Sequence, residues 1–483
     1  MNGLKQAWFN SGLIMEEIVN QNIKDSLIEH FNNNLPFIGK VDSKRISKLR
    51  EDAIESFKEN GFPTVKLEKW KNTDLTSVLD RSYLYPVNPQ AQYAKTDELF
   101  RCEVPGFDTL SVTVLNGWFV NGGMPLTKYS NGMIVGSLRA AFNEFPELIE
   151  KHYGKYADFK THGLTALNSA LAMDGIFIYV PDNVVAEKPL QMVSVINMDE
   201  DCMIQLRNLI ILGKNAELTL VQCDDSIDDH RSFINTVSEF YIGENAKLDH
   251  YKLQNINDHT TLINSSWFEV EHFADLSTNG ISLNGGFIRN ESYAHLAGSG
   301  ANADILGLYL MDRNQHIDNQ VFVDHASPDC TSNERFKGIL DDHASGVFNG
   351  HILVRRDAQR TNAYQNNRNI LISDKAVIDT KPFLEIYADD VKCSHGAAVG
   401  QLDAESMFYL RSRGISFENA RMLLMYAFAA EIVNKISIEQ LRNRIDDLVK
   451  KRLRGELSIC DQCVLHCNAQ EQKIAFKIDM SRI

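Results

Sequence analysis

The stretch Gly213-Lys214-Asn215-Ala216-Glu217-Leu218 and its echo Gly243-Glu244-Asn245-Ala246-Lys247-Leu248 decide the fold. Weaker copies of the pattern follow, and the four alanines Ala216, Ala246, Ala274 and Ala303 lie 30, 28 and 29 residues apart. A fixed period of this length is typical of a solenoid, in which each coil stacks on the next. Since the repeats consist of strand-like runs and turn residues, they predict a parallel β-helix with alanines stacked at one corner. A β-sandwich with coincidental Asn-Ala turns is the alternative.

The sequence around these repeats divides into three parts. From about residue 176, short runs rich in β-branched and aromatic residues are bounded by Gly, Asn and Asp, and no helical period returns until about 403. We therefore expect a mostly helical N-terminal region (1–175), a parallel β-helix (176–400) and a C-terminal helical domain with a Cys-rich tail (401–483). The more helix-like sequence begins at Met15, so residues 1–14 are interpreted as a start-site extension.

The C-terminal domain carries three helix signals. Asp403 is placed to cap a first helix that Gly414 closes, and Ser416 to cap a second that runs to about Lys435. The second helix is apolar on most sides, so it must be buried in its own domain or against a partner. Ser437-Ile438-Glu439-Gln440 has the form of a capping box that opens a third helix.

Composition excludes several classes of protein. The formal net charge of −15 speaks against nucleic-acid binding, which requires clustered Lys and Arg. No apolar run reaches the ~18 residues of a membrane span. The 8 cysteines are scattered through 483 residues or gathered in the tail, unlike a small disulfide scaffold, so we expect a reducing cytoplasm.

The candidate metal ligands lie where the strand-like sequence gives way to helices. In Asp389-Asp390-Val391-Lys392-Cys393-Ser394-His395-Gly396, a strand would place Cys393 and His395 on one face, together with Asp389 and Val391. A thiolate and an imidazole suit a soft or borderline metal ion. Two ligands do not complete a tetrahedral site, so this predicted site is incomplete.

The tail offers a second group of possible ligands: Cys460, Cys463, His466 and Cys467. Four such residues within a short span are compatible with metal binding or redox chemistry, and a frayed terminus is the alternative.

A polysaccharide lyase or hydrolase is the alternative function for a β-helix. It would require converging carboxylates or a basic catalytic residue on one flank, for which Asp341-Asp342-His343 and Asp324-His325 are candidates. The same residues are common in turns. The sequence contains no phosphate-binding loop, so ATP hydrolysis is not expected from this chain.

A series of ordered motifs resembles the SufB/SufD family of iron–sulfur cluster assembly proteins. The opening signature is Gly61-Phe62-Pro63-Thr64 with Glu68, Trp70-Lys71 and Thr73, and further matching segments are 335–340, 346–354, 358–363, 366–373, 381–386 and 409–415. The resemblance spans about 60 to 436. Val391-Lys392-Cys393-Ser394-His395-Gly396-Ala397 is similar to the SufD type. SufB-type chains carry a Glu-containing segment there and a further cysteine upstream, and neither is found here.

The resemblance implies a right-handed parallel β-helix between helical terminal domains. It also implies a non-catalytic scaffold subunit of the SUF system that contributes to iron acquisition. Its partners would be a SufB-type paralogue and a SufC-type ATPase held through helices 404–436. A transient iron–sulfur cluster would form at the interface with the paralogue, where His395 is the implied ligand. Cys393 is either an assisting ligand or a core thiol. The resemblance leaves open whether the complex binds reduced flavin and whether a homodimer forms in isolation.

Overall fold

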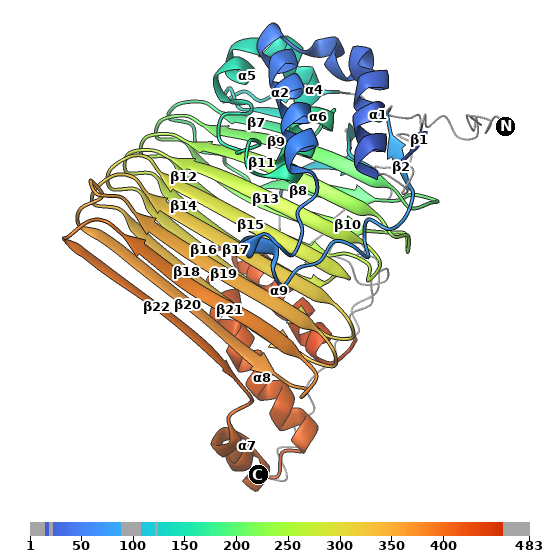
Figure 1. Cartoon of the computed structure of the whole chain (residues 1–483). Coiled ribbons are helices and arrows are strands. Elements are labelled where there is room, and N and C mark those ends of the chain that lie inside the picture. The colour runs from blue at the N-terminus through green and yellow to red at the C-terminus, as the bar shows by residue number, and fades with distance from the viewer. Residues whose placement is uncertain (1–14, 19–22, 88–107, 121–123, 457–483) are drawn as a thin grey trace, which may run out of the picture.

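Two long, mainly parallel β-sheets form the body of the protein (Figure 1). The computed structural model describes residues 15–18, 23–87, 108–120 and 124–456, so residues 1–14 and the Cys-rich tail lie outside the described residues. From β7 onward, consecutive strands alternate between the two sheets, and each pairs in parallel with the strand two positions away in sequence. The result is a β-solenoid of about 8 turns, which confirms the predicted mainly β solenoid core between helical ends.

The first sheet ends at β22 and contains ten strands: β4 (Trp118–Val120), β3 (Leu110–Leu115), β8 (Leu190–Ile196), β10 (Glu217–Ser226), β12 (Lys247–Asn255), β14 (Asp275–Asn284), β16 (Asn302–Met311), β18 (Thr331–Leu340), β20 (Thr361–Leu371) and β22 (Val391–Gly400). The second sheet ends at β21 and also contains ten: β5 (Leu126–Lys128), β6 (Ile134–Ser137), β7 (Ile176–Val180), β9 (Met203–Leu212), β11 (Phe233–Ile242), β13 (Thr261–Val270), β15 (Phe287–Leu296), β17 (His316–His325), β19 (Ser345–Val354) and β21 (Val377–Ile386). Side chains from the facing inner surfaces of both sheets form the largest apolar cluster.

Three of the four predicted corner alanines, Ala216, Ala246 and Ala274, stack on one another. The prediction for Ala303 is wrong, because Asn302 pairs with Asp275, which makes Ala301 the corner residue and places Ala303 opposite Leu276 within β16. The corner alanines Ala216, Ala246, Ala274 and Ala301 are at most 1% exposed and belong to the apolar interior. The amide of Lys247 donates to the carbonyl of Ala216 at 2.8 Å, which joins one coil to the next at this corner. Asn215 and Asn245 have φ values of 57° and 56°, a left-handed conformation that asparagine tolerates better than most residues. The repeated Asn-Ala pair therefore serves both the turn and the stacking.

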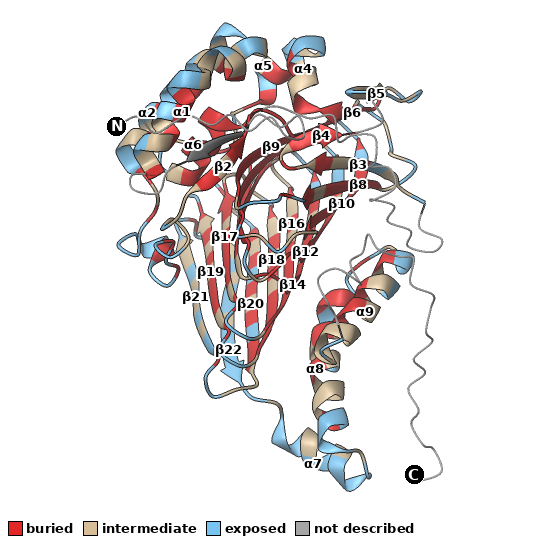
Figure 2. Cartoon of the chain, turned by 90° about the vertical axis from the view of Figure 1, so that its right-hand side faces the viewer, coloured by how far each residue is buried: buried red, intermediate tan, exposed pale blue. Residues whose placement is uncertain are grey.

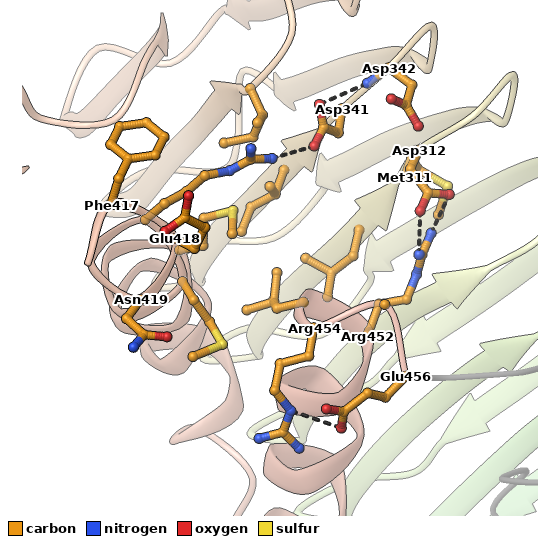
Figure 3. A pocket seen from close by; sticks show the side chains of 18 residues that line it. Met311, Asp312, Asp341, Asp342, Phe417, Glu418, Asn419, Arg452, Arg454 and Glu456 are labelled. Carbon is orange, nitrogen blue, oxygen red and sulfur yellow. Dashed lines mark hydrogen bonds and ion pairs between the residues drawn. The ribbon is translucent and has the colours of Figure 1, made fainter. Parts of the chain in front are cut away.

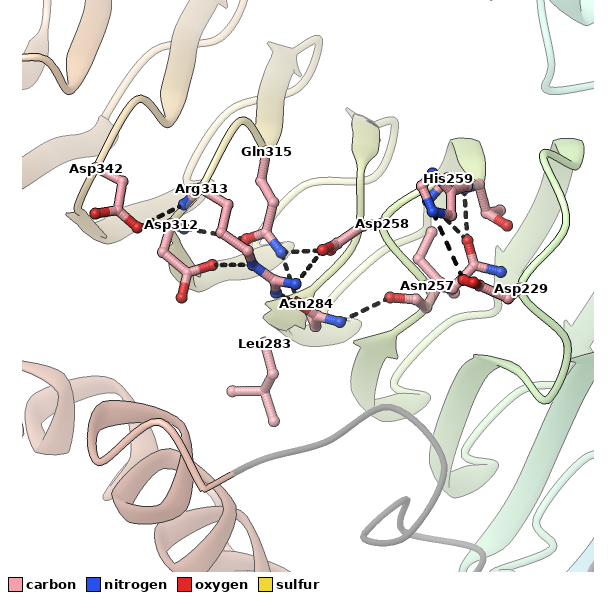
Figure 4. A network of polar contacts seen from close by, with 12 residues as sticks. Asp229, Asn257, Asp258, His259, Leu283, Asn284, Asp312, Arg313, Gln315 and Asp342 are labelled. Atoms are coloured by element: carbon pink, nitrogen blue, oxygen red, sulfur yellow. Dashed lines mark hydrogen bonds and ion pairs between the residues drawn. The ribbon is translucent and has the colours of Figure 1, made fainter.

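Polar side chains fasten the opposite corners of successive coils (Figure 4). Arg313 donates to Asn284 at 2.8 Å and also pairs with Asp258, two coils earlier. Gln315 donates to the same Asp258 at 2.7 Å and to Asn284 at 2.6 Å. The corner thus carries a continuous network of hydrogen bonds and ion pairs along the solenoid axis.

The N-terminal end of the solenoid is covered by helices α1 (Ile23–Ile38), α2 (Lys44–Asn60), α4 (Leu138–Glu144), α5 (Pro146–His152) and α6 (Gly163–Leu171), with the 3-10 turns η2 (Gly39–Val41) and η3 (Glu68–Trp70). Helix α2 packs on α6, and the buried Arg50 pairs with Asp42 at 2.6 Å and caps the end of α6 through the carbonyl of Ala172. One sequence expectation is wrong here: the sequence from Met15 is helix-like, but it begins with strand β1 (Met15–Ile18), which pairs antiparallel with β2 (Tyr83–Pro86).

Helices α7 (Ala404–Ser412), α8 (Phe417–Val433) and α9 (Glu439–Leu453) follow the last strand (Figure 2). The predicted caps form, since Asp403 accepts from the amide of Ser406 and Ser416 from that of Asn419. Helices α8 and α9 bury apolar side chains against the outer face of the first sheet. Of the two alternatives for the apolar α8, its buried residues therefore support packing within its own chain. Among the described residues, no helix is long and apolar enough to cross a membrane.

The predicted capping box at Ser437 does not form. The cap position of α9 is Ile438, which provides no side-chain hydrogen bond. The Ser437 hydroxyl instead lies 2.9 Å from the Tyr251 hydroxyl on β12, and the Ser437 amide donates to the same tyrosine oxygen at 3.1 Å. A tertiary partner 186 residues away in sequence has replaced the local one.

Candidate metal site at the open end of the solenoid

The last coil of the solenoid has no further coil stacked on it in this chain. Strands β22 and β21 are the terminal strands of the first and second sheets, and each is 10 residues long. An edge strand presents unpaired backbone N–H and C=O groups that can pair with another chain. Both strands of the last coil therefore present unpaired backbone N–H and C=O groups at the same open end of the body (Figure 1).

His395 and Cys393 occupy inward-facing positions of β22. In the parallel pairing of β20 with β22, Cys393 lies opposite Ala363 and His395 opposite Gln365, two residues that are buried inside the solenoid. His395 is nevertheless exposed, because no coil follows β22. The shared face expected for Val391, Cys393 and His395 is confirmed by the register. The expectation for Asp389 is wrong, since that residue lies in a bend before the strand, where the period of two does not apply.

Cys393 is half-buried and packs against the apolar interior. Burial raises the pKa of its thiol, and a backbone hydrogen bond from Ala363 only partly offsets that effect. A raised pKa favours the thiol over the thiolate, which is the form that binds metals. In the isolated chain Cys393 thus has the environment of a core thiol, whereas His395 is presented to solvent.

A polar column lies beneath His395. Gln365, one coil inward, donates to Oε2 of Glu334, two coils inward, at 2.5 Å. Both Gln365 and Glu334 are buried, and burial raises the pKa of Glu334 to about 7. Sequence reasoning missed this column, although the register of the repeats would have placed the three residues on one inward line.

The residues that the structure describes do not close a metal site around His395. No group of three or more His, Cys, Asp and Glu residues in that part of the chain is arranged to hold a metal ion. The tail candidates Cys460, Cys463, His466 and Cys467 lie outside the described residues. With the described residues alone, His395 and Cys393 therefore provide at most a partial ligand set.

The carboxylates considered for a lyase or hydrolase are engaged in structural contacts. Asp324 accepts two hydrogen bonds from Arg355, at 2.8 and 2.6 Å, and lies 3.0 Å from His295. His325 is buried, with Nε2 2.9 Å from the Ser332 hydroxyl. Asp341 pairs with Arg421 of α8. These side chains hold coils and a helix together, so the geometry offers no support for glycan cleavage.

Exposed apolar side chains gather near the open end, a feature that sequence reasoning missed. They are Val377 (54% exposed), Phe383 (46%), Ile386 (40%), Tyr387 (60%) and Val399 (46%). Gathered apolar residues on a surface are typical of sites where another protein binds. The alternation of side chains along a strand shows that these residues are exposed only if the strand is already known to be the last one of the solenoid.

A cleft of about 670 Å³ lies where α8 and α9 meet the first sheet (Figure 3). Asp312 accepts from Arg452 of α9 at 2.5 and 2.7 Å, and Asp341 pairs with Arg421 of α8. Both ion pairs attach helices to corners of the solenoid. The cleft therefore lies beside the junction that fixes the C-terminal helices to the body.

The two-sheet solenoid between helical ends places the chain in the class of β-solenoid proteins. Two family models match the chain: "SUF system FeS cluster assembly, SufBD core domain" over residues 195–428, and "SufBD protein N-terminal region" over residues 21–192. Together they cover most of the sequence, and the chain belongs to the SufBD family of iron–sulfur cluster assembly proteins.

Relatives in this family match large parts of this chain. The iron–sulfur cluster assembly protein SufD of Escherichia coli is 28% identical, over 86% of this chain and 95% of its own length. A SufBD family protein of Synechocystis is also 28% identical, over 86% of this chain and 92% of its own length. SufD of Bacillus subtilis is 29% identical over 67% of this chain and 74% of its own length. These similarities confirm the resemblance drawn from the motifs.

Proposed function

We propose that this chain is a SufD-type scaffold subunit, on which an iron–sulfur cluster is built as cargo at an interface with a SufB-type paralogue. The observation that carries the proposal is the position of His395, which faces inward by register but is open to solvent at the last coil. A partner that continues the solenoid end would enclose this imidazole and bring its own ligands to it. The incomplete ligand set is then completed across two chains.

The terminal strands support a partner at this end. Unpaired backbone groups along β21 and β22 favour the addition of strands from another chain, and the exposed apolar side chains nearby favour burial. A paralogue with the same solenoid cross-section would match both sheets at once. This chain would then supply the scaffold and a cluster ligand, and ATP hydrolysis would take place on another subunit.

Helix α7 and the start of α8 are proposed to hold a SufC-type ATPase. Helix α7 has no buried residue, and Phe408 (74% exposed), Tyr409 (56%) and Phe417 (47%) are presented to solvent. By contrast, the C-terminal half of α8 is occupied by the first sheet. Of the predicted ATPase-binding segment 404–436, only α7 and the start of α8 therefore remain accessible to the ATPase.

A reducing compartment is part of the proposal, and we expect the cytoplasm. Among the described residues, Cys202, Cys223, Cys330 and Cys393 form no disulfide, and the first three are buried. Burial raises the pKa of Cys202 to about 12, so this thiol is inert at neutral pH.

The test is reconstitution of the full chain with the paralogue and the ATPase, followed by iron and sulfide. His395→Ala is expected to lower the cluster content, measured by visible absorption and iron analysis, while the three chains still co-purify. Ser394→Ala is the matched control, because it alters the neighbouring side chain on the opposite face of the same strand. Unchanged cluster content and iron uptake in His395→Ala would exclude the ligand role.

A further inference from the structure

An aromatic ladder runs across five coils on the outer face of the second sheet. In the strand register, Trp267 lies beside Tyr293, Tyr293 beside Phe322, Phe322 beside His351, and His351 beside Phe383. The ring centroids of successive members are 3.9, 6.3, 5.0 and 4.8 Å apart. Trp267 and Tyr293 are each 8% exposed, whereas Phe383 is 46% exposed. The ladder thus passes from a covered end to an open one.

The segment carrying η3 crosses this ladder and is firmly attached to the sheet. The Trp70 ring lies 3.6 Å from the Arg289 guanidinium, and Thr73 donates to Asp318 at 2.6 Å. These buried anchors fix the neighbouring Lys69, whose ammonium lies 5.3 Å from the Tyr293 ring centroid and 5.7 Å from that of Phe322. The Lys69 ammonium is therefore held over the middle of the ladder by a segment that Trp70 and Thr73 anchor to the sheet.

A pocket of about 270 Å³ opens between this segment and the ladder. Its lining includes Tyr293, Phe322 and Phe383 together with Lys69 and Lys381. The volume lies below the ~300–1,000 Å³ of pockets for drug-sized ligands, so it suits one or two fused rings. Flat walls of stacked rings favour a planar ligand that stacks in the same way.

The charges around the pocket favour an anion. Lys381 pairs with Glu68 at 2.6 Å, but no carboxylate of the described residues lies within ion-pair distance of Lys69. Among carboxylates, Glu291 has the largest effect on the pKa of Lys69, and it already accepts hydrogen bonds from Arg289 and Ser265. Desolvation lowers the pKa of Lys69, as expected for an ammonium that is partly shielded and not neutralised by a carboxylate. A bound anion would supply the missing charge.

We propose that this pocket binds a small planar aromatic carboxylate, whose ring continues the ladder beside Phe322 and Phe383 and whose carboxylate pairs with Lys69. The site lies on the flank of the solenoid, apart from His395 on the first sheet. The site does not use His395, but it shares Phe383 with the exposed apolar side chains near the open end, so its binding is tested on the chain without the paralogue.

The test is isothermal titration of the full-length chain with 2-naphthoate and with its neutral analogue 2-naphthamide. We expect saturable one-to-one binding of 2-naphthoate that is about tenfold tighter than that of the amide, because only the anion pairs with Lys69. Lys69→Gln should reduce the affinity for naphthoate to that for the amide and leave amide binding unchanged. Phe322→Leu should weaken both ligands, and Lys375→Gln, an exposed lysine outside the pocket, should change neither.

Three outcomes overturn the proposal. They are the absence of saturable naphthoate binding, equal affinity for the acid and the amide, and binding that is insensitive to both Lys69→Gln and Phe322→Leu. Thermal unfolding of each variant shows that it is folded. Since Lys69 is exposed at the surface, Lys69→Gln keeps the test decisive even if Phe322→Leu fails to fold.

Discussion

Gln365 lies in register beneath His395, and it links that exposed imidazole position to a buried carboxyl group at Glu334. Oε1 of Gln365 and Oε1 of Glu334 both lack a hydrogen-bond partner among the described residues. An unprotonated Glu334 would leave a buried negative charge with a single donor, so burial raises the pKa of this group to about 7. The protonation state of Glu334, just below the proposed cluster interface, therefore changes near neutral pH.

Stability should depend on pH through Glu334. Its folded-state pKa of about 7 lies above the ordinary value of 4.5, so the folded chain binds this proton more tightly than the unfolded chain. The stabilisation is complete below the ordinary value and is lost as pH rises through about 7. Relative to Glu334→Gln, the wild type should lose about 3 kcal/mol of unfolding free energy between pH 4.5 and pH 8. Urea unfolding of both proteins at several pH values measures the difference, and parallel pH profiles would contradict it.

Arg289 should be among the most sensitive positions for stability. Its buried guanidinium pairs with Glu291 at 2.7 Å and with Asp318, and it also contacts the Trp70 ring. Arg289→Leu strands two buried carboxylates, for which a loss of about 3–5 kcal/mol in unfolding free energy is expected. Denaturant unfolding provides the measurement. Arg360→Leu is the matched control, since its ion pair with Asp329 is exposed to water and should leave stability unchanged.

The corner at Ala246 should reject a larger side chain. Ala246 is 1% exposed, and its carbonyl accepts from the amide of Asp275 in the next coil at 2.9 Å. Ala246→Leu forces extra methylenes into a packed corner, which typically costs about 1–3 kcal/mol. A lower denaturant midpoint than that of the wild type is expected. A midpoint equal to that of the wild type would show that the corner can open without cost.

The sequence predicted the solenoid because its strongest signals are local and repeated. Asn215-Ala216 and Asn245-Ala246 carry both the turn conformation and the small stacking residue, so each copy of the repeat is informative by itself. The period-2 geometry of a strand likewise placed Cys393 and His395 on one face. Such features need no knowledge of distant contacts.

What the sequence could not predict depends on partners far away in the chain. Ser437 has the local signature of a helix cap, but its hydroxyl pairs with the Tyr251 hydroxyl on β12 and does not cap α9. Likewise, exposure of His395 follows from β22 being the last strand, which no local pattern encodes. The aromatic ladder did leave a signal, since its members recur at nearly the period of the corner alanines. The ladder became recognisable only once the register aligned its members.

Helix α7 should matter for partner binding and little for folding. Phe408 is 74% exposed, and α7 has no buried residue, so Phe408→Ala should leave the thermal midpoint unchanged. If this aromatic side chain anchors the ATPase, its removal should weaken the complex about tenfold or more, as for a central interface residue. Titration with the purified ATPase, followed by a fluorescence or calorimetric signal, measures the change in Kd.

Two variants separate the anchor from a general effect of altering the surface or the helix. Glu405→Gln changes another exposed position of α7 and should bind like the wild type. Met425→Ala alters α8 where it is buried against the first sheet, and should lower stability by about 2–5 kcal/mol. Equal Kd values for Phe408→Ala and wild type would place the ATPase elsewhere. Because α7 extends beyond the sheets, its aromatic face remains accessible to a partner after the rest of the C-terminal domain has packed (Figure 2).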